Sequence, residues 1–136
     1  MTDTPWWHGI SERGLNAALG IRILDLTGDR VTATMAVTER THQPFGILHG
    51  GASIALAETA ASLGAAGRID REHFVAVGQE INANHLRQKS HGVVTATAVP
   101  VHVGRSSQVW SIDIRDEDGQ LICISRCTIA IVPRKT

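Results

Sequence analysis

The fold is decided by residues 52–66, ASIALAETAASLGAA, a stretch rich in alanine and leucine with few β-branched residues. This composition favours a helix of about four turns, and Glu58 is the only charged residue within it. A helix that is apolar on nearly every side belongs in the interior of a protein. The sequence therefore predicts one central, buried helix that carries a single carboxylate.

On both sides of this helix the sequence has the patterns of β-strands. Upstream, residues 21–26 and 30–38 flank Gly28-Asp29, and the second segment alternates in polarity, which predicts a hairpin. Before it, Ser11 is predicted to cap a short helix over residues 11–19. Downstream, turn signals separate four predicted β segments, over residues 74–89, 93–103, 108–115 and 121–132.

These elements predict an α+β fold in one domain over residues 1–136. Antiparallel strands that follow one another form a meander that bends through its own twist, and only the apolar helix is available to cover the concave face. We therefore expect a long antiparallel sheet wrapped around the central helix. Sheet edges are commonly hidden by pairing with a second copy, so we expect an oligomer.

Composition and cysteine usage exclude several classes of function. Thirteen basic residues balance thirteen acidic ones, so no positive field favours binding to nucleic acid or to an anionic membrane. No apolar run reaches the roughly 18 residues of a membrane span, and the N-terminus lacks signal-peptide features, so we expect a cytoplasmic protein. Cys123 and Cys127 are expected to be buried free thiols about 13 Å apart. The seven histidines lack paired ligand spacing, so no metal is expected.

The clearest chemical signal is residues 43–51, QPFGILHGG, which lead into the central helix. Pro44, Gly46 and the Gly50-Gly51 pair allow a tight approach that presents backbone N–H groups at the positive end of the helix dipole. Such a helix start can bind a pyrophosphate or an oxyanion that develops from a carbonyl. The nucleotide-binding glycine motifs are absent, and a double glycine fits close packing equally well.

Glu58 supplies a second chemical group. A carboxylate surrounded by apolar helix residues is costly unless it lies on an exposed stripe, a structural hydrogen bond satisfies it or a reaction uses it. Ser62, one turn later, is expected on the same face, where it could orient the carboxylate or a water. Glu58 lies about 12 Å along the helix from Gly50, too far for both to contact one carbonyl. Two copies with antiparallel central helices would bring Gly50 of one near Glu58 of the other, which predicts sites shared between subunits.

Three blocks of sequence, QPFGILHGGASIALAE, GQEINANHLR and VHVGRSSQVW, occur in this order. Together they resemble the hotdog-fold acyl-CoA thioesterases over roughly residues 11–132. More narrowly, they resemble the branch of the 1,4-dihydroxy-2-naphthoyl-CoA, enterobactin-proofreading and Glu-dependent 4-hydroxybenzoyl-CoA thioesterases. The resemblance implies a hotdog fold, hydrolysis of an acyl-CoA to a free acid and coenzyme A, and no cofactor, since CoA is part of the substrate. We also expect a homodimer that pairs again into a homotetramer.

The resemblance assigns roles to individual residues. Glu58 would be the general base for water or the nucleophile, and the Gly50 N–H would polarise the thioester oxygen. His49 and Gln43 would position the acyl group, the lytic water or the leaving sulfur, and Ser62 would lie near that water. Substrate contacts are expected at Gly78, His85, Leu86, Arg87, Gln88, His102, Val103, Gly104, Arg105, Ser106 and Ser107. Of these, the two arginines are expected to bind CoA phosphates.

Other functions stay open on the sequence. A hotdog dehydratase of hydroxyacyl thioesters could use His49 and Glu58, although the HFP-type run of fatty-acid dehydratases is absent. A non-catalytic acyl-CoA-binding protein would not need a carboxylate beside the carbonyl. The expected acyl group is 1,4-dihydroxy-2-naphthoyl, which belongs to menaquinone biosynthesis. Hydroxybenzoyl is the second choice, and medium-chain fatty acyl groups stay possible.

Overall fold

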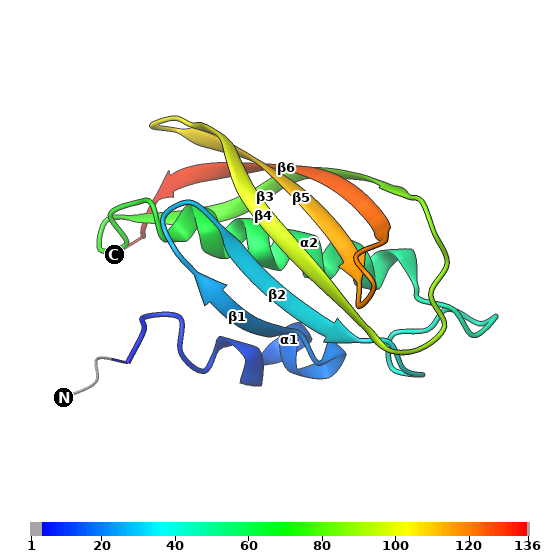
Figure 1. The fold of residues 1–136 in the computed structure, drawn as a ribbon. Coiled ribbons are helices and arrows are strands. Elements are labelled where there is room, and N and C mark those ends of the chain that lie inside the picture. The colour runs from blue at the N-terminus through cyan, green and yellow to red at the C-terminus, as the bar shows by residue number, and fades with distance from the viewer. Residues whose placement is uncertain (1–3, 136) are drawn as a thin grey trace.

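The computed structural model describes residues 4–135, which form a six-stranded antiparallel sheet curved around one long helix (Figure 1). In chain order, the elements are η1 (Ile10–Glu12), α1 (Gly14–Leu19), β1 (Arg22–Leu26), β2 (Val31–Ala36), α2 (Gly50–Ala66), β3 (Phe74–His85), β4 (Val93–Val103), β5 (Ser107–Asp116) and β6 (Leu121–Pro133). The predicted α+β architecture, with the sheet wrapped around the helix, is confirmed.

The strand order is β1-β2-β4-β5-β6-β3. Strands β1 and β2 form the predicted hairpin, and β4, β5 and β6 follow as a meander. Strand β3 lies at the far edge, where Phe74 pairs with Pro133 and His85 with Cys123. The expected continuous meander is therefore wrong at its first strand, because β2 and β5 occupy both edges of β4. Strand β3 also ends at His85, so residues 86–92 cross between strands instead of forming a tight turn.

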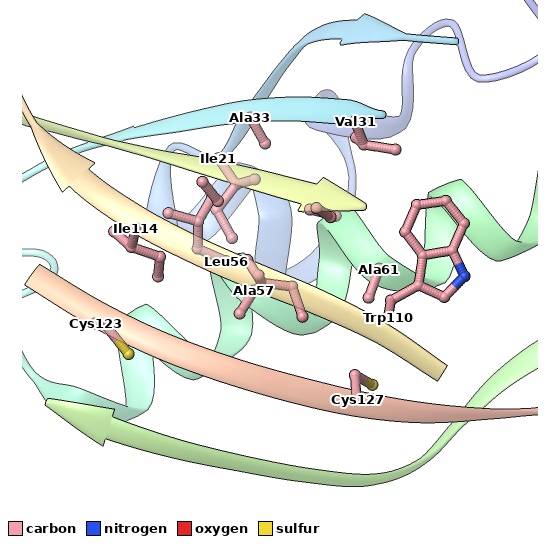
Figure 2. Close-up of a cluster of buried hydrophobic side chains, with 14 of the residues drawn as sticks. Ile21, Val31, Ala33, Leu56, Ala57, Ala61, Trp110, Ile114, Cys123 and Cys127 are labelled. Atoms are coloured by element: carbon pink, nitrogen blue, oxygen red, sulfur yellow. The ribbon is translucent and has the colours of Figure 1, made fainter. Parts of the chain in front are cut away.

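The core lies between the concave face of the sheet and α2 (Figure 2). Fully buried helix residues pack against the sheet: Leu56, Ala57, Ala60 and Ala61. Trp110 of β5 lies so close to α2 that a Cβ added to Gly64 would overlap its indole ring. The indole N–H donates to Oε1 of the buried Gln108 at 2.8 Å, so the polar edge of this large side chain is satisfied. Small helix residues thus set the distance between helix and sheet.

One side of α2 is half-exposed, so the helix is not buried all round. A stripe that we call the open stripe contains Ile54, Ala55, Glu58, Thr59 and Ser62. The expectation that Glu58 is enclosed among the buried leucine and alanines is therefore wrong, because Glu58 is half-buried on the open stripe, beside the edge strand β3. Alanine fits a buried and a half-exposed position equally well, so composition alone could not separate the two faces.

The N-terminal helix is shorter than expected. Arg13 has extended backbone angles (φ −128°, ψ 146°) and separates η1 from α1. Ser11 is therefore not the cap of the helix, and its Oγ accepts a hydrogen bond from the Ile23 N–H at 3.3 Å instead. The helix ends at Gly20, whose left-handed φ of 73° suits a glycine, and this end was correctly predicted.

Both cysteines are buried and free, as predicted. Burial, with a smaller effect of the Glu58 and Glu80 charges, raises the pKa of Cys127 to about 12. This thiol is therefore protonated and unreactive near neutral pH. None of the helices between residues 4 and 135 has the length and apolar character that a membrane crossing requires.

Candidate active site

The loop before α2 holds the helix start in place through backbone hydrogen bonds. The Leu48 N–H donates to Lys89 O at 2.7 Å, and the His49 N–H donates to Thr41 O at 2.8 Å. His49 is the N-cap, and its Nδ1 accepts from the Gly51 N–H at 2.8 Å, which leaves the proton of a neutral ring on Nε2. Gly50 is the first residue of this 17-residue helix, and its N–H has no partner within residues 4–135. A free donor therefore lies at the positive end of the helix dipole.

A cavity of about 420 Å³, here called the loop cavity, opens beside this donor. Gln43 enters it from a tight turn in which its Oε1 accepts from the Phe45 N–H, so its Nε2 stays available as a donor. A Cβ added to Gly50 would lie 2.7 Å from His85 Nε2, so the imidazole lies next to the helix start. The loop cavity is lined by Gln43, Ile47, Leu48, Gly50, Ser53, His85, Leu86, Arg87, Gln88 and Ile122. The structure thus brings together Gln43, Gly50 and the predicted contacts at residues 85–88.

A second cavity of about 540 Å³, here called the helix cavity, lies along the open stripe of α2. It is lined by Leu15, Asn16, Gly51, Ile54, Ala55, Glu58, Thr59, Ser62 and Leu63. Glu58 and Ser62 share it, as the helical spacing predicted. The Glu58 carboxylate lies against β3, where a Cβ added to Gly78 would overlap Oε2. Among residues 4–135 this carboxylate has neither an ion-pair nor a hydrogen-bond partner, so it is free to act on a ligand.

Two polar residues of the helix cavity were missed by the sequence analysis. Thr59 Oγ1 donates to Asn16 Oδ1 at 3.2 Å, and Asn16 Nδ2 donates to Ile10 O at 3.3 Å. The available signal was a threonine directly after Glu58 in an otherwise alanine-rich helix. Asn16 gave no signal, because it is 43 residues away in sequence and only the packing of α1 on α2 brings it near.

The remaining predicted contacts lie elsewhere in the chain. Residues 102–107 form the β4–β5 hairpin, where the Gly104 N–H donates to Ser107 O at 2.9 Å. Ser107 pairs through β5 with Ala130 of β6, whereas His85 pairs with Cys123 of the same strand. These two positions on β6 are about 23 Å apart along the strand. One chain therefore does not bring its hairpin together with residues 85–88.

Comparison with known proteins assigns the chain to a family. Residues 45–123 match the thioesterase superfamily. The chain is also 52% identical over 122 residues to the 1,4-dihydroxy-2-naphthoyl-CoA hydrolase of Listeria monocytogenes, covering 90% of this chain and 98% of that protein. It belongs to the thioesterase superfamily.

Two further relatives agree with this assignment. This thioesterase is 49% identical over 136 residues to the proofreading thioesterase EntH of Cronobacter turicensis, covering 93% of this chain and 98% of that protein. A crystal structure of a glutamine-to-alanine variant of thioesterase PA1618 from Pseudomonas aeruginosa matches it with a TM-score of 0.92 at 41% identity and covers 97% of each chain. The hotdog fold and acyl-CoA thioesterase activity expected from the sequence are thus confirmed, which disfavours the dehydratase alternative.

A group of potential metal ligands lies outside the two cavities. Within the described residues, the one group of potential ligands is Asp70, Glu72 and His73, all exposed in the connection between α2 and β3. His73 Nδ1 lies 2.6 Å from Asp70 Oδ2, and this contact lowers the pKa of Asp70, so the two side chains already satisfy one another. That no metal or cofactor takes part in the reaction stays a prediction.

Proposed function

We propose that this thioesterase hydrolyses a hydroxyaryl acyl-CoA, such as 1,4-dihydroxy-2-naphthoyl-CoA or a hydroxybenzoyl-CoA, to the free acid and CoA. The observation that carries the proposal is the Glu58 carboxylate, which lines a largely apolar cavity beside Ser62 and Gly78 without a partner among residues 4–135. The names of two relatives, a 1,4-dihydroxy-2-naphthoyl-CoA hydrolase and a proofreading thioesterase, support the same class of reaction.

Glu58 performs the first step in one of two ways. As a general base, it takes a proton from water while the water oxygen attacks the thioester carbonyl. As a nucleophile, it forms an acyl–carboxylate anhydride that water then hydrolyses. In both routes the C–S bond breaks, and the CoA sulfur leaves as a thiolate that takes up a proton. Ser62, one turn further along α2, orients the carboxylate or the water.

The loop cavity supplies the other half of the chemistry. The free N–H of Gly50 stabilises the negative charge that develops on the thioester oxygen, at the positive end of the α2 dipole. Gln43 and His49 position the acyl group, the water or the leaving sulfur. Arg87 lies in this cavity with its guanidinium available for a phosphate of CoA.

The complete site is shared between two copies of the chain. Strand β3 is an edge strand, and the Glu58–Gly78 contact shows that the open stripe of α2 adjoins it. Antiparallel pairing of β3 with its copy reverses the strand, so the Gly78 end of one strand meets the His85 end of the other. Glu58 and the 102–107 hairpin of one copy then approach Gly50 and Arg87 of the other. Association of these dimers into a homotetramer and a cytoplasmic location stay predictions.

The deciding experiment is Glu58→Gln, measured by release of the free CoA thiol from hydroxyaryl acyl-CoA substrates. We expect kcat to fall about 10²- to 10⁴-fold with a smaller change in KM, because the amide can neither accept the water proton nor attack the carbonyl. Glu39→Gln, which neutralises an exposed carboxylate outside both cavities, is the matched control and should retain activity. Full turnover by Glu58→Gln contradicts the assignment, and acyl-CoA binding without turnover by the unmodified protein indicates a binding protein.

A further inference from the structure

The helix cavity has a polar patch besides Glu58 and Ser62. Asn16 comes from α1 and Thr59 from α2, both are half-buried, and both line the cavity. Most of the remaining wall is apolar, formed by Leu15, Ile54, Ala55 and Leu63. Polar side chains in such a wall are costly unless they are satisfied, and their unused donors and acceptors select what binds beside them.

The hydrogen bonds of the pair determine what it can offer to a ligand. A carbonyl only accepts, so the Asn16 group that contacts Ile10 O is the amide nitrogen. Asn16 Oδ1 therefore faces Thr59 and accepts the proton of its hydroxyl. This arrangement leaves the lone pairs of Thr59 Oγ1 as acceptors and the second N–H of Asn16 as a donor. An acceptor beside a donor is the complement of one hydroxyl group.

We propose that Asn16 and Thr59 bind a hydroxyl substituent on the acyl group and thereby select hydroxylated aryl acyl-CoAs over their unsubstituted analogues. This inference rests on the proposed function, because it places the acyl group in the helix cavity next to Glu58. The hydroxyl of the substrate donates to Thr59 Oγ1 and accepts from Asn16 Nδ2. Thr59 directly follows Glu58, and Ser62 neighbours both along the helix. The catalytic carboxylate and the Asn16–Thr59 pair therefore line the same cavity.

The charge of the cavity narrows the class of acyl group further. No lysine, arginine or histidine is among the residues described as lining it, and Glu58 is its one charged side chain. An acyl group that carries its own carboxylate would be repelled there, whereas a neutral hydroxyl is accepted. A plain aliphatic or unsubstituted aryl group fits the apolar wall but leaves the Asn16–Thr59 pair without its ligand partner.

The test compares matched substrates that differ only in hydroxyl groups. The pairs are 1,4-dihydroxy-2-naphthoyl-CoA with 2-naphthoyl-CoA, and 3- and 4-hydroxybenzoyl-CoA with benzoyl-CoA. We expect the native enzyme to prefer the hydroxylated member of at least one pair by about tenfold or more in kcat/KM, the size of one neutral hydrogen bond or larger. Thr59→Val keeps the shape of the side chain and removes the acceptor, so it should abolish this preference while turnover of the unsubstituted member is retained.

Three further variants separate recognition from folding. Thr59→Ser keeps the hydroxyl and should keep the preference for hydroxylated substrates. Asn16→Ala removes the donor and should reduce this preference. Thr95→Val makes the same change at a half-exposed position on β4, outside the helix cavity, and should leave the substrate preference unchanged. Melting temperatures show whether each variant is folded.

The outcomes distinguish this inference from the function on which it rests. An enzyme that hydrolyses both members of every pair equally, or a preference that survives in both Thr59→Val and Asn16→Ala, overturns the role of the pair and leaves the thioesterase proposal intact. An equal loss on both members of a pair shows a purely structural role and also overturns it. If the native enzyme hydrolyses no aryl acyl-CoA, the proposed function fails, and the inference fails with it.

Discussion

Gly50 is a residue at which one hydrogen-bond donor can be removed without removing the helix. It is the first residue of α2, a position that tolerates proline because its N–H has no partner in the helix. His49 has extended angles (φ −69°, ψ 129°), which also suit the residue before a proline. We therefore expect Gly50→Pro to fold with a melting temperature similar to that of the native protein. Its kcat should fall about 10²- to 10³-fold, which is the usual effect of removing one hydrogen-bond donor to an oxyanion.

Gly50→Ala is the matched control for that variant. Its Cβ also meets the His85 ring, at 2.7 Å from Nε2 before the exposed side chain moves, but the N–H is retained. Thiol-release kinetics should therefore show much higher kcat for the alanine than for the proline variant. Equal losses in the two variants would assign the effect to His85 and contradict a role for the N–H.

Gly78 has no side chain, and the Glu58 carboxylate occupies the space beside it. A Cβ at this position would overlap Glu58 Oε2, so Gly78→Ala must displace the carboxylate. We expect kcat to fall about tenfold to 100-fold, because a shift of about 1 Å in a reacting group has effects of this size. Gly28→Ala is the control, since its Cβ would meet only Arg68 Nη1 at 4.0 Å. Unchanged kinetics in Gly78→Ala would show that Glu58 acts from another position.

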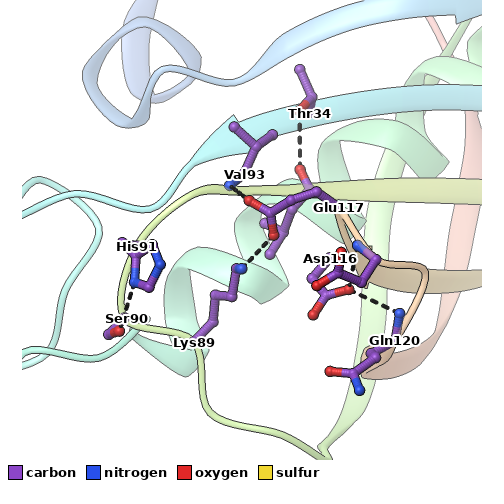
Figure 3. A network of polar contacts seen from close by, with 10 residues as sticks. Thr34, Lys89, Ser90, His91, Val93, Asp116, Glu117 and Gln120 are labelled. Carbon is purple, nitrogen blue, oxygen red and sulfur yellow. Dashed lines mark hydrogen bonds and ion pairs between the residues drawn. The ribbon is translucent and has the colours of Figure 1, made fainter.

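At the scale of elements, the β3–β4 connection ties the loop before α2 to the β5–β6 turn (Figure 3). Lys89 O accepts the Leu48 N–H, and Lys89 Nζ pairs with the Glu117 carboxylate. Glu117 Oε2 also accepts from the Val93 N–H at 2.9 Å. A side-chain pair between two turns thus holds the backbone that positions the start of α2.

This pair predicts an acid-dependent part of stability. The hydrogen bond from Lys89 lowers the pKa of Glu117 to about 2, from its usual 4.5. A carboxylate whose pKa is lowered by folding stabilises the protein above its unfolded pKa, and this stabilisation is lost as the pH falls through the folded value. The melting temperature of the native protein should therefore exceed that of Glu117→Gln most above about pH 5, and the difference should disappear towards pH 2.

The control for this pH dependence is Glu39→Gln, which neutralises an exposed carboxylate outside the Lys89–Glu117 pair. It should show little difference from the native protein across the same range. A constant offset between Glu117→Gln and the native protein down to pH 2 would contradict the lowered pKa as its cause.

At the scale of the whole molecule, shared sites predict complementation between inactive variants. In a mixed dimer of Glu58→Gln and Gly50→Pro chains, one site contains both changes and the other contains neither. Random pairing gives about half mixed dimers, so co-expression should recover about a quarter of native activity. Two differently tagged Glu58→Gln chains should recover none. If mixed dimers isolated through their two tags have no activity, the two residues of a site come from one chain.

Local sequence patterns by themselves determined the elements and part of the chemistry. The central helix, the first hairpin, the glycine that ends α1 and the shared face of Glu58 and Ser62 all follow from spacing over a few residues. The two buried thiols follow from alternation along one strand. These predictions succeeded because helical and strand periodicity depend mainly on near neighbours in the chain.

Only the tertiary structure decided which elements meet. It placed β3 at the far edge of the sheet, put Glu58 on the open stripe, and brought Asn16 to Thr59 across 43 residues. These arrangements depend on which strand edges are already occupied and on which helix face the sheet leaves uncovered. Helical spacing places Glu58 and Ser62 on one face, but it does not say which segments pack beside that face, so its neighbours arise from packing between distant parts of the chain.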